Sequence, residues 1–327
     1  MKTFRANGKL LVSGEYTILD GSLSLAIPTQ IGQVMHYKEL DQDILHWRSL
    51  DMKGETWFEA HFHGAELIIE DSSDHRKAKT LKEILLAAAV LSNKLNRLKG
   101  EVTTALEFPT DWGLGSSSTL LCCVAQCFDI DPMQLHFKVS NGSGYDVACG
   151  MTDSAITYQL DDGLVEVNQI DWKPDFCSSL FFVYLNAKQK SSSEVNKYQG
   201  RKSSIDLATI VEEISALTRT MMHATSLDVF NEAITKHEEI MSCVLGYPTV
   251  RQRYFSDYKG AVKSLGAWGG DFILATGNAK DRAYFAEKGF SVIHEFDSFI
   301  LEPKDFMKTL LIIISQHFLH TFLKPYF

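Results

Sequence analysis

Alternating apolar and polar residues dominate the first part of the chain, and they predict a β-sheet. Residues 41–70 have the two-residue period of antiparallel strands, most clearly in "TWFEAHFHGAELIIE". The segments "KLLVSGEYTIL" and "SLSLAIPTQIGQVMHY" also have a strand-like pattern, and we expect Gly14 to divide the first of them into two strands.

Helical periodicity appears after this β-rich part. Strong helix formers occupy residues 80–98, an apolar helix is predicted for "STLLCCVAQCF", and residues 203–245 are largely helical in pattern. Further strands are predicted in "EVTTALEFPT", "LFFVYLN", "GDFILATG" and "SVIHEF", and "GYDVACGMTDSAITYQL" predicts a turn followed by a strand. Polar side chains interrupt the apolar residues 309–327, which favours a docked strand or helix over an anchor.

The order of these elements, β-rich first and mixed afterwards, predicts an α+β protein of two lobes. Pro174 and a polar cluster separate two strand-like runs in "QIDWKPDFC". We therefore expect a boundary near Asp171–Asp175, with one domain over residues 1–172 and a second over residues 173–327.

The acidic charge balance limits the classes of partner. The 327 residues are 45% hydrophobic and carry a formal net charge of −9, which argues against a protein that binds nucleic acid or a membrane surface. An anionic ligand would need a locally positive site. The six cysteines show no C-x-x-C pair and no Cys/His spacing typical of a zinc site. Without a signal-peptide pattern or a membrane-spanning run, the sequence predicts a cytoplasmic protein.

The stretch "PTDWGLGSSSTL" (109–120) has the composition of a phosphate-binding loop. Gly113 and Gly115 permit unusual backbone angles, and three serines, of which one could be the N-cap, stand where the apolar helix begins. Because a helix N-terminus presents unpaired N–H groups, it is a natural anion site. An ordinary capped turn fits this stretch equally well. Neither the P-loop pattern nor the dinucleotide-binding fingerprint is present.

Three other segments carry candidate chemistry. Lys9 stands at an expected strand start in "NGKLLVSGEYTILDG", and Asp146 follows a glycine turn in "NGSGYDVACG", where it could act as a general base. Three glycines in "KSLGAWGGDFIL" would bring the backbone close to a ligand. Taken singly, each segment is more often structural: a surface lysine beside a hairpin, an Asx turn and a tight hairpin.

Taken in order, "GKLLVSGEY", "PTDWGLGSSST" and "SLGAWGGD" resemble the three motifs of the GHMP small-molecule kinases, which include galactokinase and the homoserine, mevalonate and phosphomevalonate kinases. The resemblance extends from about Asn7 to Gly277. "GEY", "GSGYDVA" and the "GGD" ending look most like phosphomevalonate kinase, and mevalonate kinase is close. The segment "NAKQKSSSEV" (186–195) is similar to a segment with lysine and hydroxyl side chains in both enzymes.

The resemblance implies a fold with an N-terminal lobe like domain 2 of ribosomal protein S5 and a ferredoxin-like C-terminal lobe, with ATP and Mg²⁺ as cofactors. In the implied catalytic pair, Asp146 orients or accepts the acceptor proton, while Lys9 steadies Asp146 and the γ-phosphoryl charge. Ser117 matches the serine that reaches Mg²⁺. The implied phosphate loop comprises Gly113, Leu114, Gly115, Ser116, Ser117, Ser118 and Thr119. The positions implied to lie near the acceptor are Glu15, Tyr16, Ser143, Lys188, Gly266, Gly269 and Gly270.

The sequence departs from the family pattern at four places. Asn7 stands for a proline, Ser118 for an alanine, and Trp268 for a small residue, which we expect to narrow the acceptor pocket. Where mevalonate kinases carry a Mg²⁺-binding glutamate, "DIDPMQLHFKVSNGSGYD" has none, and Asp129 and Asp131 are candidate substitutes.

The expected function is transfer of the ATP γ-phosphoryl group to a small-molecule acceptor, phosphomevalonate or mevalonate, in isoprenoid precursor synthesis. The alternatives are a mevalonate kinase proper, a decarboxylase of the same superfamily, and a nucleotide-binding relative with another acceptor or without catalysis. We expect no nucleic-acid or membrane partner, and a monomer or homodimer.

Overall fold

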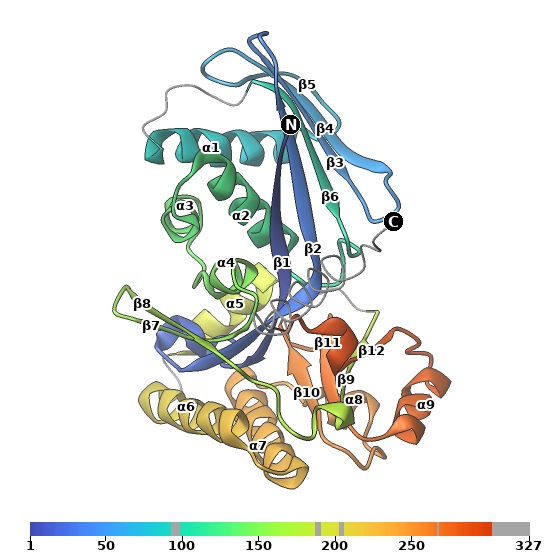
Figure 1. The fold of residues 1–327 in the computed structure, drawn as a ribbon. Coiled ribbons are helices and arrows are strands. Elements are labelled where there is room, and N and C mark those ends of the chain that lie inside the picture. Colours follow the sequence, from blue (N-terminus) through green and yellow to red (C-terminus); the bar gives the residue numbers. More distant parts are fainter. Residues whose placement is uncertain (93–98, 187–190, 203–205, 267, 303–327) are drawn as a thin grey trace, which may run out of the picture.

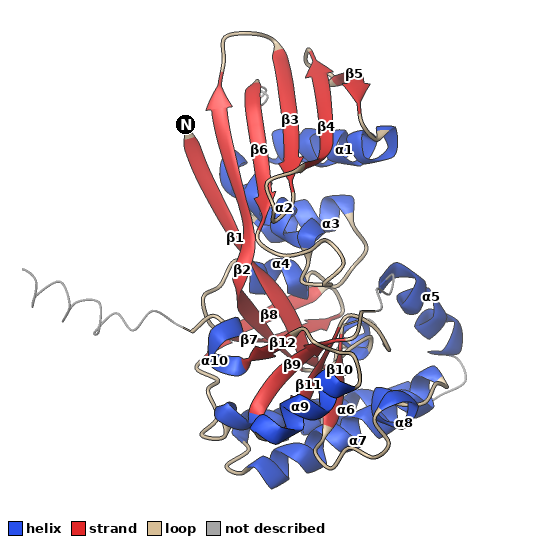
Figure 2. Ribbon diagram, turned by 90° about the vertical axis from the view of Figure 1, so that its right-hand side faces the viewer, coloured by secondary structure: helices blue, strands red, loops and turns tan. Residues whose placement is uncertain are grey.

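The computed structural model describes residues 1–302 except for 93–98, 187–190, 203–205 and 267. The described chain contains two sheets, stacked along the long axis of the molecule (Figures 1 and 2). The first sheet has the strand order β5-β4-β3-β6-β2-β7-β8, with β1 paired to β2. Its strands are β1 (Lys2–Ser13), β2 (Ser24–Glu39), β3 (Ile44–Leu50), β4 (Thr56–His63), β5 (Ile68–Ser72), β6 (Gly100–Leu106), β7 (Ala155–Asp161) and β8 (Leu164–Ile170).

The long strand β2 changes partner halfway along its length. Its residues 33–39 pair with β6 and its residues 24–26 pair with β7, while β1 runs along its other edge. The upper half of the sheet is covered on one face by helices (Figure 1). These are α1 (His75–Leu91), α2 (Ser116–Phe128) and α3 (Pro132–Val139). The alternation of apolar and polar residues in 41–70 predicted strands with one buried face, and the structure has them: one face of these strands is buried under the helices.

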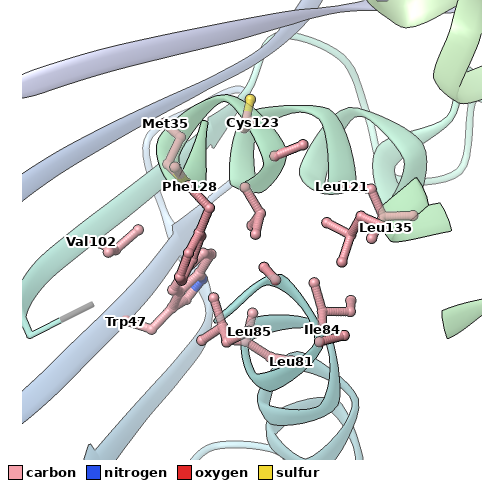
Figure 3. Close-up of a cluster of buried hydrophobic side chains, with 14 of the residues drawn as sticks. Met35, Trp47, Leu81, Ile84, Leu85, Val102, Leu121, Cys123, Phe128 and Leu135 are labelled. Carbon is pink, nitrogen blue, oxygen red and sulfur yellow. The ribbon is translucent and has the colours of Figure 1, made fainter. Parts of the chain in front are cut away.

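Buried side chains between this sheet and its helices form the core of the upper half. Trp47 of β3 meets Phe128 of α2 and Leu85 of α1 there (Figure 3). Burying such a large aromatic or aliphatic side chain is worth about 1.5–3 kcal/mol. The packed core therefore fixes where α2 begins, and with it the position of the glycine-serine loop.

The second sheet has the order β10-β11-β9-β12. Its strands are β9 (Leu180–Tyr184), β10 (Val262–Leu265), β11 (Phe272–Thr276) and β12 (Ile293–Glu295). The helices of this half are α5 (Ser191–Arg201), α6 (Leu207–His223), α7 (Leu227–Leu245), α8 (Val250–Tyr254), α9 (Ala279–Glu287) and α10 (Phe296–Phe299). A continuous apolar cluster joins the lower part of β1 and β2 to β9, β11, α6 and α7. Residues 171–179 connect the two sheets, and a domain division at residue 172 stays a prediction.

Several local predictions were wrong. Residues after Gly14 form a 3-10 turn, η1 (Thr17–Asp20), instead of a second strand, because Gly14 and Tyr16 have positive φ values of 89° and 65°. The "GYDVACG" segment is a short helix, α4 (Tyr145–Gly150). Lys9 lies within β1 rather than at its start, and Gly115, not a serine, is the N-cap of α2. The apolar segment 309–327 lies outside the described residues.

Other predictions are confirmed. The helical pattern predicted for residues 203–245 corresponds to α6 and α7 over the described residues from 207 onward, and strands are present at all four of the later predicted positions. None of the helices in the described ranges combines the length and apolar character needed to cross a bilayer.

Candidate functional site

A cavity of about 650 Å³ lies where the two halves of the molecule meet. Lys9 of β1, Asp146 of α4 and Asp271, just before β11, all line it, although more than 260 residues separate the first from the last. Ser117 contributes the start of α2. Side chains from both sheets are therefore needed to build this site.

The glycine-serine loop ends in an unobstructed helix N-terminus. Gly113 and Gly115 have φ values of 69° and 89°, which turn the chain sharply into α2. The first hydrogen bond of the helix joins the Thr119 N–H to the Gly115 carbonyl at 2.9 Å. The N–H groups of the residues before Thr119 in the first turn therefore have no carbonyl within the helix to bond. They provide the partial positive charge that an anion requires.

An irregularity in β1 brings Lys9 to this loop. The β1–β2 register shifts between Asn7 and Lys9, and the Lys9 N–H bonds the Leu114 carbonyl at 3.0 Å instead of β2. The Lys9 ammonium donates to the Gly113 carbonyl at 3.1 Å and lies 5.3 Å from the centre of the Tyr145 ring. Burial alone would lower the pKa of Lys9, but Tyr145, Asp146 and Asp271 outweigh it and raise that pKa, so the ammonium stays charged.

Asp146 lies in the first turn of α4, after a tightly held loop. Gly144 is the N-cap of this helix, with φ 86°, and the Asp146 carboxylate accepts the Val147 N–H at 3.0 Å. The Tyr158 hydroxyl donates to the Ser143 carbonyl, and His136 Nε2 bonds the Gly142 carbonyl at 3.0 Å. These contacts fix the loop, so the carboxylate is presented to the cavity by a rigid support.

Asp271 is a cavity residue that the sequence reasoning did not single out. Its backbone has a positive φ of 52°, and its side chain is only 5% exposed. A Cβ on Gly113 would collide with the Asp271 carboxylate, so the loop can pass only because residue 113 is a glycine. The "GGD" ending was the available signal: a carboxylate directly after a glycine turn and before a buried strand.

Neither Asp129 nor Asp131, the candidate substitutes for the missing glutamate, lines this cavity. Asp129 is the C-cap of α2, and Asp131 is the N-cap of α3, where it accepts the Met133 N–H. A helix of 13 residues such as α2 is about 20 Å long, and the cavity lies at its other end. Besides Asp146, two other carboxylates line the cavity: Glu15, which is paired with Lys263, and Asp271.

Glu15 and Tyr16 also line the cavity, but both side chains have structural partners. The Glu15 carboxylate lies 2.6 Å from the Lys263 ammonium, and both groups are buried. The Tyr16 hydroxyl accepts a hydrogen bond from the main-chain N–H of Trp268 at 2.8 Å. The expectation that Trp268 narrows the pocket was wrong, because its ring packs into a cluster with Tyr16 and Tyr198 and does not line the cavity.

The remaining predicted residues differ in how they lie relative to the cavity. Ser143 and Gly266 line the cavity, whereas Gly269 and Gly270 are buried nearby without lining it. Ser118 and Thr119 turn inward: their hydroxyls bond the Gly115 carbonyl at 2.9 Å and Gln33 at 2.7 Å. Lys188 lies outside the described residues. The side chain of Leu114 is buried in the apolar cluster between the two sheets.

A second, smaller cavity of about 290 Å³ adjoins the loop on the other side. Its walls are apolar and include Trp47, Phe58 and Leu81, and Lys77 lies over the Trp57 ring at 5.2 Å. Ser117 lines both cavities, so the loop stands between them. The sequence reasoning missed this cavity because its wall comes from four strands and two helices that are far apart along the chain.

No protein-family model matches the chain, and no curated protein matches its sequence. Solved structures do match. Phosphomevalonate kinase of Streptococcus pneumoniae, in complex with phosphomevalonate and AMPPNP, has a TM-score of 0.68 at 18% identity, over 90% of this chain and 99% of that chain.

Mevalonate kinase of L. major, in complex with R-mevalonate, has a TM-score of 0.63 at 10% identity, over 93% of this chain and 97% of that one. Lactococcus lactis galactokinase, complexed with galactose, has a TM-score of 0.64 at 13% identity, over 88% of each chain. The prediction of a two-lobed α+β fold is confirmed: this chain has the GHMP kinase fold over about 90% of its length.

Proposed function

We propose that this protein is an ATP-dependent kinase of small molecules. One observation carries the proposal: Lys9, Asp146 and Asp271 stand in one cavity with the open N-terminus of α2. The fold is that of kinases whose solved structures hold R-mevalonate, phosphomevalonate with AMPPNP, or galactose. Fold alone does not define a reaction, so the argument rests on this cavity.

ATP would lie across the glycine-serine loop. The apolar cavity beside Trp47 and Leu81 suits the adenine base, and the triphosphate would pass over the first N–H groups of α2, which begins at Ser116. The γ-phosphoryl group would then face the larger cavity, where the acceptor binds. Ser117, which lines both cavities, marks the crossing point.

Transfer needs a base and a fixed positive charge. The acceptor oxygen forms a bond to the γ-phosphorus while the bond to the bridging oxygen of ADP breaks, and Asp146 receives or orients the acceptor proton. Lys9 remains charged beside this carboxylate and offsets the negative charge that spreads over the phosphoryl oxygens. Little more is required, since phosphoryl transfer depends mainly on positioning and electrostatics.

The cavity also offers the hard oxygen ligands that Mg²⁺ prefers. The Ser117 hydroxyl and the Asp271 carboxylate would hold the ion, with Asp271 in place of the missing glutamate. When bound, Mg²⁺ neutralises phosphate charge. The fit rests on the chemistry of these donors, and Asp271 is held in place by its close contact with Gly113.

For the acceptor, we propose phosphomevalonate, with mevalonate as the second candidate. Support comes from the "GEY", "GSGYDVA" and "GGD" segments, from the similarity to a phosphomevalonate kinase structure, and from a cavity volume sufficient for a small acceptor. ATP binding without transfer is the competing hypothesis.

A coupled assay of ADP release tests the proposal, with phosphomevalonate, mevalonate, galactose and homoserine as acceptors. We expect turnover with phosphomevalonate or mevalonate, and turnover at least about 100-fold slower in an Asp146→Asn variant. Turnover with only a sugar or homoserine would overturn the acceptor but keep the kinase. ATP binding without turnover on any acceptor would overturn the kinase, and release of carbon dioxide from diphosphomevalonate would replace it with a decarboxylase.

A further inference from the structure

Two histidines and a glutamate cluster on the open face of the first sheet. His46 lies on β3, and Glu59 and His61 lie on β4. One ligand atom from each of the three side chains lies within 4.8 Å of the others. His46 Nε2 is 2.6 Å from Glu59 Oε1, and the His46 and His61 rings stack with their centres 4.3 Å apart. Among the described residues, no other group of this kind brings three such ligands together.

Strand pairing holds this cluster in place. His46 is directly opposite His61 in the antiparallel β3–β4 register, and Glu59 is two residues away on the same face. The intervening residues Trp47 and Ala60 point the other way and are almost completely buried under the helices. A change of register would expose Trp47, so the three ligands are set by the packing of the core.

We propose that His46, Glu59 and His61 form a binding site for a zinc-class divalent ion. Two imidazole nitrogens and one carboxylate oxygen are a known ligand combination for Zn²⁺, with a water molecule in the fourth position. Tetrahedral coordination at ordinary bond lengths needs ligand atoms about 3.3 Å apart. Since the atoms already lie within 4.8 Å, small side-chain rotations are sufficient.

The charges around the cluster are mixed. Arg48 is the strand partner of Glu59, and its positive charge opposes a cation, while Asp71 faces His61 and Glu101 faces His46 across the neighbouring strands. Glu101 is paired with Lys38 at 3.3 Å. The two imidazoles, rather than the surrounding charge, must therefore select the ion. This favours Zn²⁺ over Mg²⁺, which prefers oxygen ligands and near-octahedral geometry.

This site is separate from the proposed kinase site, because the helices that cover the sheet and the start of α2 lie on the opposite face of the strands (Figure 1). The sequence reasoning found no zinc spacing because it searched for neighbouring cysteines and histidines. Here 15 positions separate His46 from His61, and only the hairpin register brings them together.

Zinc binding to the full-length protein, freed of any purification tag and of nucleotide, tests the proposal. Zn²⁺ is titrated in competition with a chromogenic chelator. We expect one equivalent of tight binding, which weakens at least about tenfold in His46→Asn, His61→Asn and Glu59→Gln variants. The matched control is His63→Asn, which changes a histidine on the same strand that lies 3.9 Å from Glu70. This control and Asp146→Asn should keep the affinity.

Co²⁺ provides a second readout. Four-coordinate Co²⁺ at this site should give an intense visible absorption that disappears in His61→Asn, while circular dichroism verifies that each variant is folded. Equal affinities in the native protein and the three ligand variants would overturn the proposal. The same would follow if His63→Asn or Asp146→Asn abolished binding.

Discussion

The ammonium of Lys263 lies 2.6 Å from the carboxylate of Glu15, although 248 positions separate the two residues. Both side chains are buried, and the contact joins the turn after β1 to the second sheet. Lys263 also lies 3.5 Å from Glu238, whose other oxygen accepts the Ser264 hydroxyl. One lysine is therefore shared by two buried carboxylates, of which Glu15 lines the larger cavity.

His237 completes this network as a neutral ring. The Gly14 N–H donates to His237 Nε2 at 3.2 Å, so this nitrogen carries no proton, and its position 3.4 Å from Glu15 is not an ion pair. Burial, and then the Lys263 charge, hold the pKa of His237 well below its usual value, which agrees with this assignment.

The first prediction concerns Lys263. A Lys263→Met variant should lose about 3–5 kcal/mol of unfolding free energy, because it leaves two buried carboxylates without their cation. Urea denaturation measures this loss, and adding Glu15→Gln should recover part of it. The control is Lys288→Met, which removes an exposed pair with Asp257 and should lower the unfolding free energy far less, because water screens an exposed ion pair. Similar losses in the two single variants would contradict the network.

The second prediction concerns Glu238 and pH. Burial, opposed by Lys263 and reinforced by Glu15, raises the pKa of Glu238 from 4.5 to about 7. Between these values the folded protein binds a proton that the unfolded chain has lost. The contribution of Glu238 to stability is therefore fully present below pH 4.5 and is lost as the pH rises through 7.

A Glu238→Gln variant should remove this dependence. The stability difference, native minus variant, should fall by more than about 1 kcal/mol between pH 5 and pH 7.5, since one pKa unit corresponds to about 1.4 kcal/mol. Urea denaturation at both pH values measures it. Glu239→Gln, at the exposed neighbouring position, should show no such change, and a constant difference for Glu238→Gln would refute the assignment.

The third prediction separates a collision from simple backbone strain. Gly113 and Gly163 both have positive φ, 69° and 79°, but only a Cβ on Gly113 meets another group, the Asp271 carboxylate. Gly163→Ala should cost about 1–2 kcal/mol. Gly113→Ala should cost more and weaken ATP binding at least about tenfold. An added Asp271→Ala should restore stability but not activity, and equal costs for the two glycine variants would disprove the contact.

The fourth prediction concerns the proposed base. Asp146→Asn should lower kcat at least about 100-fold, because proton transfer by a placed side chain contributes on that scale. ATP affinity, measured by calorimetry, should change less than about threefold. If ATP affinity falls with kcat, Asp146 acts chiefly in metal or nucleotide binding.

The fifth prediction tests the adenine cavity. Thr80 lines this cavity, and a Thr80→Trp substitution should fill it and raise KM for ATP at least about tenfold without changing KM for the acceptor. Lys79→Trp adds the same ring at an exposed neighbouring position that does not line the cavity. Steady-state kinetics with each substrate varied in turn would distinguish the two variants. An unchanged ATP KM in Thr80→Trp would place the base elsewhere.

The sequence alone determined those features that depend on local pattern. The alternation in residues 41–70 identified strands with one buried face, and "GLGSSSTL" identified a glycine turn at a helix start. Both follow from short-range geometry. Three motifs in the right order were sufficient to predict the kinase fold, because each motif contains a glycine turn that this fold uses.

Only the tertiary structure decided which side chains meet. Asp271, rather than Asp129 or Asp131, lines the cavity together with Ser117, and Trp268 packs away from the cavity. Glu15 meets Lys263, and His46 meets His61, through strand register and lobe packing. Such contacts depend on the burial of distant apolar residues against one another. The free energy of this long-range burial is not encoded in the pattern of any one segment, so no single segment could predict these contacts.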